Sequence, residues 1–140
     1  MIKTLTNDLE KLASSAKERG RPFRVLIVDD EEWVRDVFKD FCGLTRAFEI
    51  DMASSGAEAI ALVEENTYDL ITVDLIMPEM SGLDALQEIK KRSPRVPVMI
   101  ITGNATDRLV IQAGVQGASR VMYKPILLEE FISEITAILV

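Results

Sequence analysis

The chain has 140 residues, of which 48% are hydrophobic and 28% are charged, so its size suits one compact domain with a single core. Acidic residues (23) outnumber basic ones (16), and the net charge of -7 removes the attraction on which non-specific nucleic-acid binding depends. The composition therefore argues against a separate output domain and against direct binding of DNA or RNA.

The first 22 residues predict an amphipathic helix that stands apart from the rest of the chain. Apolar residues recur there at spacings of three and four, at Ile2, Leu5, Leu9, Leu12 and Ala16. Gly20 and Pro22 then break the pattern. An isolated helix of this length is marginal, so it either packs back on its own domain, frays, or pairs with another copy or a partner protein.

This N-terminal stretch is too polar for a signal peptide. No apolar run anywhere in the chain approaches the roughly 20 residues of a membrane span. The sequence therefore predicts a cytoplasmic protein that has no membrane partner.

From residue 23 onward, short β-branched runs alternate with longer stretches of helical period. Strands are predicted at Arg24–Val28, Glu49–Ala53, Leu70–Val73, Val96–Ile101 and Arg120–Tyr123. Helices are predicted at Glu32–Leu44, Gly56–Asn66, Leu83–Arg92, Asp107–Val115 and Leu128–Leu139. Strict alternation of strand and helix predicts a doubly wound α/β fold, in which helices cover both faces of a parallel sheet.

Local signals support these helices. Good N-cap residues precede three of them, namely Ser54 and Ser55, Ser81, and Thr106. The single cysteine, Cys42, cannot form an intramolecular disulfide and shares helical spacing with Phe38 and Phe41. We therefore expect Cys42 to be a buried thiol.

Polar residues follow four of the five predicted strands. They are Asp29 and Asp30 after the first strand, Asp74 after the third, Thr102 after the fourth and Lys124 after the fifth. The second strand ends in Ser54, as suits an edge strand. Because ligands of open α/β sheets bind outside the carboxyl ends of the strands, these side chains are predicted to converge on one crevice.

Three carboxylates in one crevice repel each other unless a cation compensates them. An all-oxygen set without histidine or thiolate favours Mg²⁺ or Mn²⁺. A lysine and a hydroxyl beside such a metal suit the binding of a phosphoryl group. An aspartate can itself be the nucleophile and form an acyl phosphate, and the isolated Asp74 is the best candidate.

Each of these signals also has an ordinary structural explanation. Adjacent aspartates before a helix often cap it, a strand-end threonine is usually structural, and a lysine before a proline is usually a solvated turn residue. Capping does not explain all five residues falling at strand ends. The combination therefore favours a functional site.

The motifs LIVDDE, VDLIMPEMSG, IITG and YKP resemble, in order and spacing, those of the receiver domains of two-component response regulators, the CheY-like family. The resemblance covers about Phe23 to Val140. It divides the chain into an N-terminal segment, 1–22, and a receiver domain, 23–140. It also implies the strand order 2-1-3-4-5 and a cis bond between Lys124 and Pro125.

The resemblance implies roles for individual residues. Asp74 would be the phosphoacceptor, and Mg²⁺ would be bound by Asp30, Asp74 and the backbone carbonyl of Ile76, with Asp29 acting through water. Thr102 would hydrogen-bond the phosphoryl group and Lys124 would form an ion pair with it. Smaller roles fall to Gly103, which leaves space beside the phosphoryl group, and to Pro78 and Gly82, which shape the loop after Asp74.

Two departures from the family pattern stand out. The family often has a switch aromatic three residues before the lysine, where this chain has Val121, and the nearest aromatic is Tyr123 on the same face of the strand. Ile76 and Asn104 occupy positions at which the family tunes attack by water on the phosphoryl group. An apolar Ile76 cannot hydrogen-bond that water, so we expect a long-lived phosphoryl group.

The chain contains no histidine, so its phosphoryl donor must act in trans. The expected partner is a histidine kinase or a histidine phosphotransfer protein. A homodimer through the N-terminal helix, or through the fourth helix, fifth strand and fifth helix, is also possible. The predicted function is therefore that of a signalling switch rather than an enzyme.

Two other functions remain open. One is a receiver-like scaffold that works without phosphorylation, which the intact set of site residues argues against. The other is a haloacid dehalogenase-like phosphatase. That class places its nucleophile on the first strand in a DxD motif, whereas here the isolated acid, Asp74, follows the third.

Overall fold

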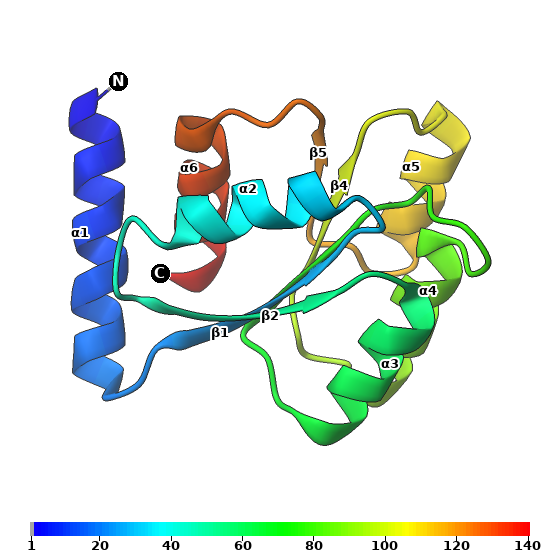
Figure 1. Ribbon diagram of the computed structural model, residues 1–140, viewed down its shortest axis with the longest axis horizontal. Coiled ribbons are helices and arrows are strands. Elements are labelled where there is room, and N and C mark those ends of the chain that lie inside the picture. Colours follow the sequence, from blue (N-terminus) through cyan, green and yellow to red (C-terminus); the bar gives the residue numbers. More distant parts are fainter. Residues whose placement is uncertain (1) are drawn as a thin grey trace.

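The computed structural model describes residues 2–140 and contains one five-stranded parallel sheet with helices on both faces (Figure 1). Its strands are β1 (Phe23–Val28), β2 (Phe48–Ala53), β3 (Leu70–Val73), β4 (Val98–Thr102) and β5 (Arg120–Tyr123). Its helices are α1 (Ile2–Arg19), α2 (Glu32–Cys42), α3 (Gly56–Glu65), α4 (Gly82–Arg92), α5 (Asp107–Val115) and α6 (Leu128–Leu139). No helix in the described part of the chain is long and apolar enough to cross a membrane.

The sheet order is β2-β1-β3-β4-β5, and every neighbouring pair is parallel, which confirms the predicted fold class. The register aligns the strand ends: Val28 of β1 lies beside Val73 of β3, and Thr102 of β4 lies beside Tyr123 of β5. Residues that follow these strands are therefore delivered to one edge of the sheet.

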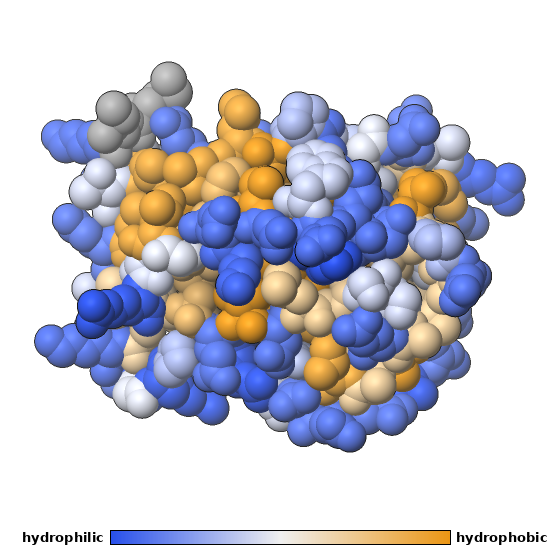
Figure 2. All heavy atoms as spheres, in the orientation of Figure 1, coloured by the Kyte–Doolittle hydropathy of each residue, from blue (hydrophilic) through white to orange (hydrophobic). Residues whose placement is uncertain are grey.

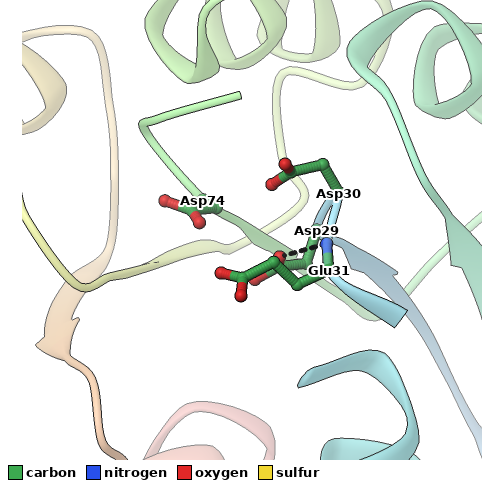
Figure 3. A group of neighbouring side chains, drawn as sticks. All are labelled: Asp29, Asp30, Glu31 and Asp74. Carbon is green, nitrogen blue, oxygen red and sulfur yellow. Dashed lines mark hydrogen bonds between the residues drawn. The ribbon is translucent and has the colours of Figure 1, made fainter. Parts of the chain in front are cut away.

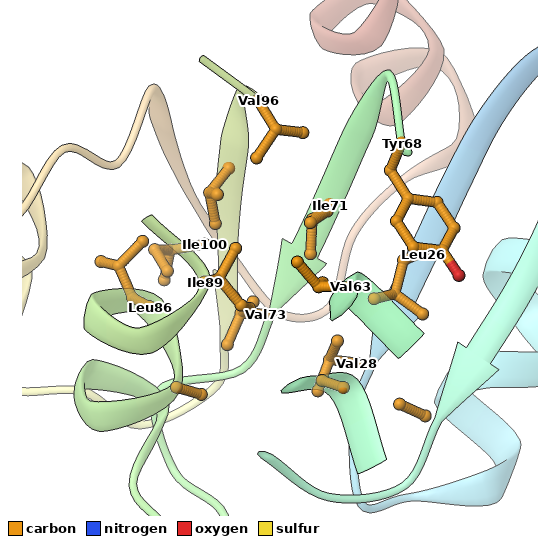
Figure 4. Close-up of a cluster of buried hydrophobic side chains, with 14 of the residues drawn as sticks. Leu26, Val28, Val63, Tyr68, Ile71, Val73, Leu86, Ile89, Val96 and Ile100 are labelled. Carbon is orange, nitrogen blue, oxygen red and sulfur yellow. The ribbon is translucent and has the colours of Figure 1, made fainter. Parts of the chain in front are cut away.

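Two apolar clusters hold the helices on the sheet, one on each face. On β1, Leu26 and Val28 belong to the cluster under α3, α4 and α5, whereas Val25 and Ile27 belong to the cluster under α1, α2 and α6. Figure 4 shows the first cluster, in which α3 and α4 side chains pack on the central strands. Because both faces are buried there, the three central strands β1, β3 and β4 are largely apolar, whereas the edge strands β2 and β5 carry charged residues.

The N-terminal helix α1 packs on α6, and Figure 1 shows the two helices side by side. Leu12 is fully buried and Ala16 is buried in the same cluster as Phe131. Figure 2 shows apolar side chains gathered between α1 and α6. Of the three possibilities for this helix, the structure therefore has it packed on its own domain. The side chain of Ile2, also part of the predicted apolar stripe, lies outside the described residues.

Polar contacts fix the end of α1. The Arg19 guanidinium lies 4.4 Å from the Phe23 ring centroid and its Nη2 lies 2.9 Å from Oδ1 of Asp69. The helix ends at Arg19, and Gly20 directly after it has a φ of 74°, a conformation that glycine adopts without strain.

The boundaries predicted from residue 23 onward are all confirmed to within two residues. One of the largest differences is in the fourth strand, which begins at Val98 rather than Val96 and includes Thr102. Pro97 directly precedes it and has no N–H for the ladder, which explains the late start. Of the predicted caps, the side chains of Ser55, Ser81 and Thr106 accept hydrogen bonds from backbone N–H groups. Cys42 is buried, as expected.

We predict that Leu12→Ala lowers the free energy of unfolding by about 2–5 kcal/mol, because it leaves a cavity in the apolar cluster where α1 packs on α6. Lys11→Ala, at the neighbouring exposed position, should change it by less than about 0.5 kcal/mol. Urea unfolding followed by circular dichroism measures both. Equal midpoints for the two variants would show that α1 is not part of the cooperative fold.

Candidate functional site

Backbone hydrogen bonds continue the sheet just past the strands and place the site residues. The Asp29 N–H donates to the carbonyl of Ala53 at 3.1 Å, and the Asp74 N–H donates to that of Val28 at 3.2 Å. On the other side, the Lys124 N–H donates to the carbonyl of Thr102 at 2.9 Å. The ends of all five strands are thus tied together, and the predicted residues meet at one edge.

An acidic group occupies this edge. It consists of Asp29, Asp30, Glu31 and Asp74, each of which offers a carboxylate oxygen within 4.8 Å of the others. Figure 3 shows these carboxylates drawn together from the end of β1 and the end of β3. Asp29 and Asp74 are buried, whereas Asp30 and Glu31 are exposed.

Lys124 neutralises part of this charge. Its Nζ lies 2.8 Å from Oδ2 of Asp29 and 2.8 Å from Oδ2 of Asp74, so one ammonium joins the ends of β1 and β3. Burial by itself lowers the pKa of Lys124. Hydrogen bonds and attraction from the two aspartates outweigh that effect and raise the pKa to about 12. Lys124 is therefore a permanent cation at this edge. The Lys124–Pro125 bond is cis, as the resemblance implied.

The Asp29 carboxylate is held from several sides. Burial raises its pKa, and hydrogen bonds from Lys124 and from the backbone N–H of Glu31 partly offset that rise. Behind it, Nη1 of Arg35 donates to the Asp29 carbonyl at 2.6 Å. A carboxyl whose pKa stays high despite a bound ammonium lies where further positive charge is favourable.

The donor set fits a hard divalent cation. Four carboxylates face one ammonium, and the group contains only oxygen donors, the ligands that Mg²⁺ prefers. A second feature lies at the same edge. The hydroxyl of Thr102 is buried and has no hydrogen-bond partner among the described residues, although buried polar groups are normally paired. These residues suit a metal ion together with an anionic oxygen group.

The loop after Asp74 is built tightly around the carboxylate. The Ile76 N–H donates to Oδ1 of Asp74 at 3.0 Å, and the Gly82 N–H closes the loop onto the carbonyl of Leu75. Glu79, directly after Pro78, takes a left-handed conformation with φ of 68°. A Cβ at Gly82 would lie 2.1 Å from the Asp74 carbonyl oxygen, so only glycine fits there. The side chain of Ile76 is half exposed at the mouth of the site.

The other predicted residues are farther from the acidic group. Gly103 faces the Lys124 side chain, with 3.6 Å between a Cβ added to it and Cδ of the lysine. Asn104 is exposed on the β4–α5 loop. On β5, Val121 packs against the cluster under α5, and Tyr123 is exposed beside Thr102 in the strand register.

One residue of the site, Glu31, was missed by sequence reasoning. Glu31 belongs to the acidic group and lies 3.5 Å from Nζ of Lys124, and Trp33 donates its indole N–H to Glu31 at 2.8 Å. The third acid of the run DDE was the available signal. It reads equally well as the start of the following helix, where acids are common.

Known proteins are similar to this chain in sequence and in structure. Residues 25–136 match the family model described as the response regulator receiver domain. The chemotaxis protein CheY of Thermotoga maritima is 38% identical over 73% of this chain and 85% of the relative. A protein-glutamate methylesterase/protein-glutamine glutaminase of Pyrococcus horikoshii is 44% identical over 59% of this chain, but only 23% of that longer protein is covered.

Among solved structures, the CheX-CheY-BeF3-Mg+2 complex from Borrelia burgdorferi matches with a TM-score of 0.82 at 27% identity, covering 89% of this chain and 94% of that chain. A receiver domain protein (CheY-like) from Methanospirillum hungatei matches with a TM-score of 0.81 at 25% identity, covering 84% of this chain and 94% of that one.

We predict that Gly82→Ala destabilises the fold by about 2 kcal/mol or more, because its Cβ would collide with backbone that cannot move without displacing Asp74. Gly114→Ala is the matched control. That helical glycine has nothing within 4 Å of an added Cβ, so alanine should stabilise by about 0.5–1 kcal/mol. Thermal unfolding of both variants checks the signs, and a stable Gly82→Ala protein would contradict the loop geometry.

Proposed function

The chain belongs to the response regulator receiver domain family, and from that membership we propose that it accepts a phosphoryl group on Asp74. The donor would be a phosphohistidine of a histidine kinase or of a histidine phosphotransfer protein. An oxygen of Asp74 bonds to phosphorus, the phosphorus–nitrogen bond breaks, and the imidazole leaves with the electron pair. The product is an acyl phosphate on this chain. It acts as a signal, with no substrate turned over.

One observation carries this proposal. A single ammonium, that of Lys124, lies 2.8 Å from Asp74 and 2.8 Å from Asp29, at the edge where the buried Thr102 hydroxyl has no partner among the described residues. A phosphoryl group on Asp74 would offer acceptor oxygens to both the ammonium and the hydroxyl. The site thus contains a hydrogen-bond donor, the Thr102 hydroxyl, that its own carboxylates do not use.

Mg²⁺ would be held by Asp29, Asp30 and Asp74 together with the backbone carbonyl of Ile76. When bound, it would supply positive charge against the charge that develops on the transferring phosphoryl oxygens. Two groups of the chain itself have the remaining roles. Lys124 holds the negative charge that arrives on Asp74, and the Ile76 N–H fixes the carboxylate through Oδ1.

A partner protein would then have to recognise the phosphorylated form. We propose that residues 23–140 form the receiver domain and that residues 1–22 are an addition to it. The CheY in the Borrelia burgdorferi complex was solved with CheX, BeF3 and Mg+2, which supports a comparable partner interaction here. The haloacid dehalogenase-like alternative lacks support, because β1 ends in adjacent acids and the isolated Asp74 follows β3. A scaffold that works without phosphorylation would not need the charge arrangement around Lys124.

We predict that incubation with Mg²⁺ and acetyl phosphate adds one phosphoryl group to the native protein and none to Asp74→Asn. Intact-protein mass spectrometry measures the addition. Size-exclusion chromatography of the same samples tests whether phosphorylation changes the oligomeric state.

Asp30→Asn serves as the second variant. Asp30 is exposed, so its replacement should leave the fold unchanged while weakening Mg²⁺ binding and slowing phosphorylation at least tenfold. Continued turnover of a phosphate monoester by the native protein would instead favour a phosphatase. Phosphorylation of Asp74→Asn at the native rate would exclude Asp74 as the acceptor.

We further predict a long-lived phosphoryl group, because the side chain of Ile76 lies at the mouth of the site and cannot hydrogen-bond an attacking water. Ile76→Asn should shorten the half-life severalfold, and Ile76→Leu should leave it unchanged. The decay of the phosphorylated mass after removal of the donor gives both values. A half-life of seconds in the native protein would contradict the prediction.

A further inference from the structure

Glu31 is fixed over the site by a neighbouring side chain on its own segment. The indole N–H of Trp33 donates to Oε2 of Glu31 at 2.8 Å, and the Glu31 backbone N–H donates to Oδ1 of Asp29 at 2.9 Å. Both side chains are exposed, with relative exposures of 45% for the Glu31 side chain and 62% for Trp33. The carboxylate therefore has a set direction although it lies at the surface.

That direction is toward Lys124. The other carboxylate oxygen of Glu31, Oε1, lies 3.5 Å from Nζ of Lys124. This distance is longer than a good hydrogen bond but short enough for an ion pair. The two nearer partners of the ammonium are Asp29 and Asp74, at 2.8 Å each. Of the three carboxylates around Lys124, only Glu31 is exposed and can move without leaving a buried charge behind.

We propose that Glu31 is a positioning residue that competes with the phosphoryl group for Lys124, and that the Trp33 indole keeps it in place to do so. The proposal rests on phosphoryl binding at Asp74. Glu31 weakens phosphoryl binding, because it holds the Lys124 ammonium close to the carboxylates and away from the phosphoryl oxygens. In this chain, the affinity for a phosphoryl group is thus set partly by a residue that never touches it.

The sign follows from the charges. A phosphoryl group on Asp74 replaces about one negative charge by about two at the point nearest Lys124. Glu31 adds another negative charge a few ångströms away, which repels the phosphoryl oxygens and occupies their counter-ion. Removing that charge should therefore favour the phosphoryl-bound state. Since the pair is exposed, the effect is moderate and falls as salt is raised.

The test measures binding of beryllofluoride, a phosphoryl mimic, at saturating Mg²⁺ by ¹⁹F nuclear magnetic resonance. We expect Glu31→Gln to bind it about three- to tenfold more tightly than the native protein at low salt, and less so at high salt. Trp33→Phe keeps the ring but loses the N–H. It should shift the affinity in the same direction by a smaller factor, because Glu31 remains charged but is no longer held.

Glu32→Gln is the matched control. It removes the same charge one residue further along, at an exposed position on α2, whereas the ion pairs of Lys124 within the described chain are with Asp29, Glu31 and Asp74. Its affinity should equal that of the native protein. Thermal unfolding of all variants, followed by circular dichroism, establishes that each is folded.

Separate titrations with Mg²⁺ alone, followed through the single tryptophan, distinguish the competing outcome. If Glu31→Gln loses Mg²⁺ affinity and binds beryllofluoride more weakly, Glu31 is a metal ligand and the proposal is wrong. Unchanged beryllofluoride affinity in Glu31→Gln, or an equal gain in Glu32→Gln, also overturns it. If the native protein does not bind beryllofluoride with Mg²⁺ present, the proposed phosphoryl function itself fails.

Discussion

The ammonium of Lys124 is the point on which the rest of the site depends. It bridges Asp29 at the end of β1 and Asp74 at the end of β3, and it is delivered there from the end of β5. Three strands therefore converge on one charge. Without it, two buried carboxylates would face each other with nothing between them, a cost that the fold avoids only because a lysine follows β5. The same ammonium is the cation best placed to receive new negative charge on Asp74.

The sheet makes this convergence possible by being covered on both faces. Leu26 and Ile27 bury their side chains in opposite clusters, so the carboxyl-terminal half of β1 has no polar face on which a carboxylate could lie. The acidic residues that follow β1 and β3 therefore lie where these strands leave the core. Asp74 follows four fully buried residues of β3 and is itself still buried, which gives it a low-dielectric setting and a single open side. The apolar strand therefore fixes where the Asp74 carboxylate leaves the core.

Hydrophobic periodicity and the rule for strand ends predicted the fold class and the convergence of Asp29, Asp30, Asp74 and Lys124. The strand order came from the family resemblance, because periodicity does not say which strands are neighbours. Sequence reasoning did not predict the role of Glu31. A third acid after two aspartates fits a helix start equally well, and only its contact with Trp33 and Lys124 separates the two explanations. The packing of α1 was also left open. An apolar stripe states which face is buried but not what buries it, and Leu12 is buried by tertiary contacts that no local pattern encodes.

This chain has no aromatic residue at the position, three before Lys124, where the family often has its switch ring. Val121 lies where an aromatic would be expected and packs into the cluster under α5, while Tyr123 stands exposed beside Thr102. Val121 has no ring, and the ring of Tyr123 is exposed rather than buried beside the Thr102 hydroxyl. Along the backbone, Lys124 is followed by Pro125, and α6 begins four residues after the lysine, at Leu128. Because α1 packs on α6, this loop leads from the end of β5 to the α1–α6 pair. The N-terminal helix is therefore connected to Lys124 through α6 and one short loop.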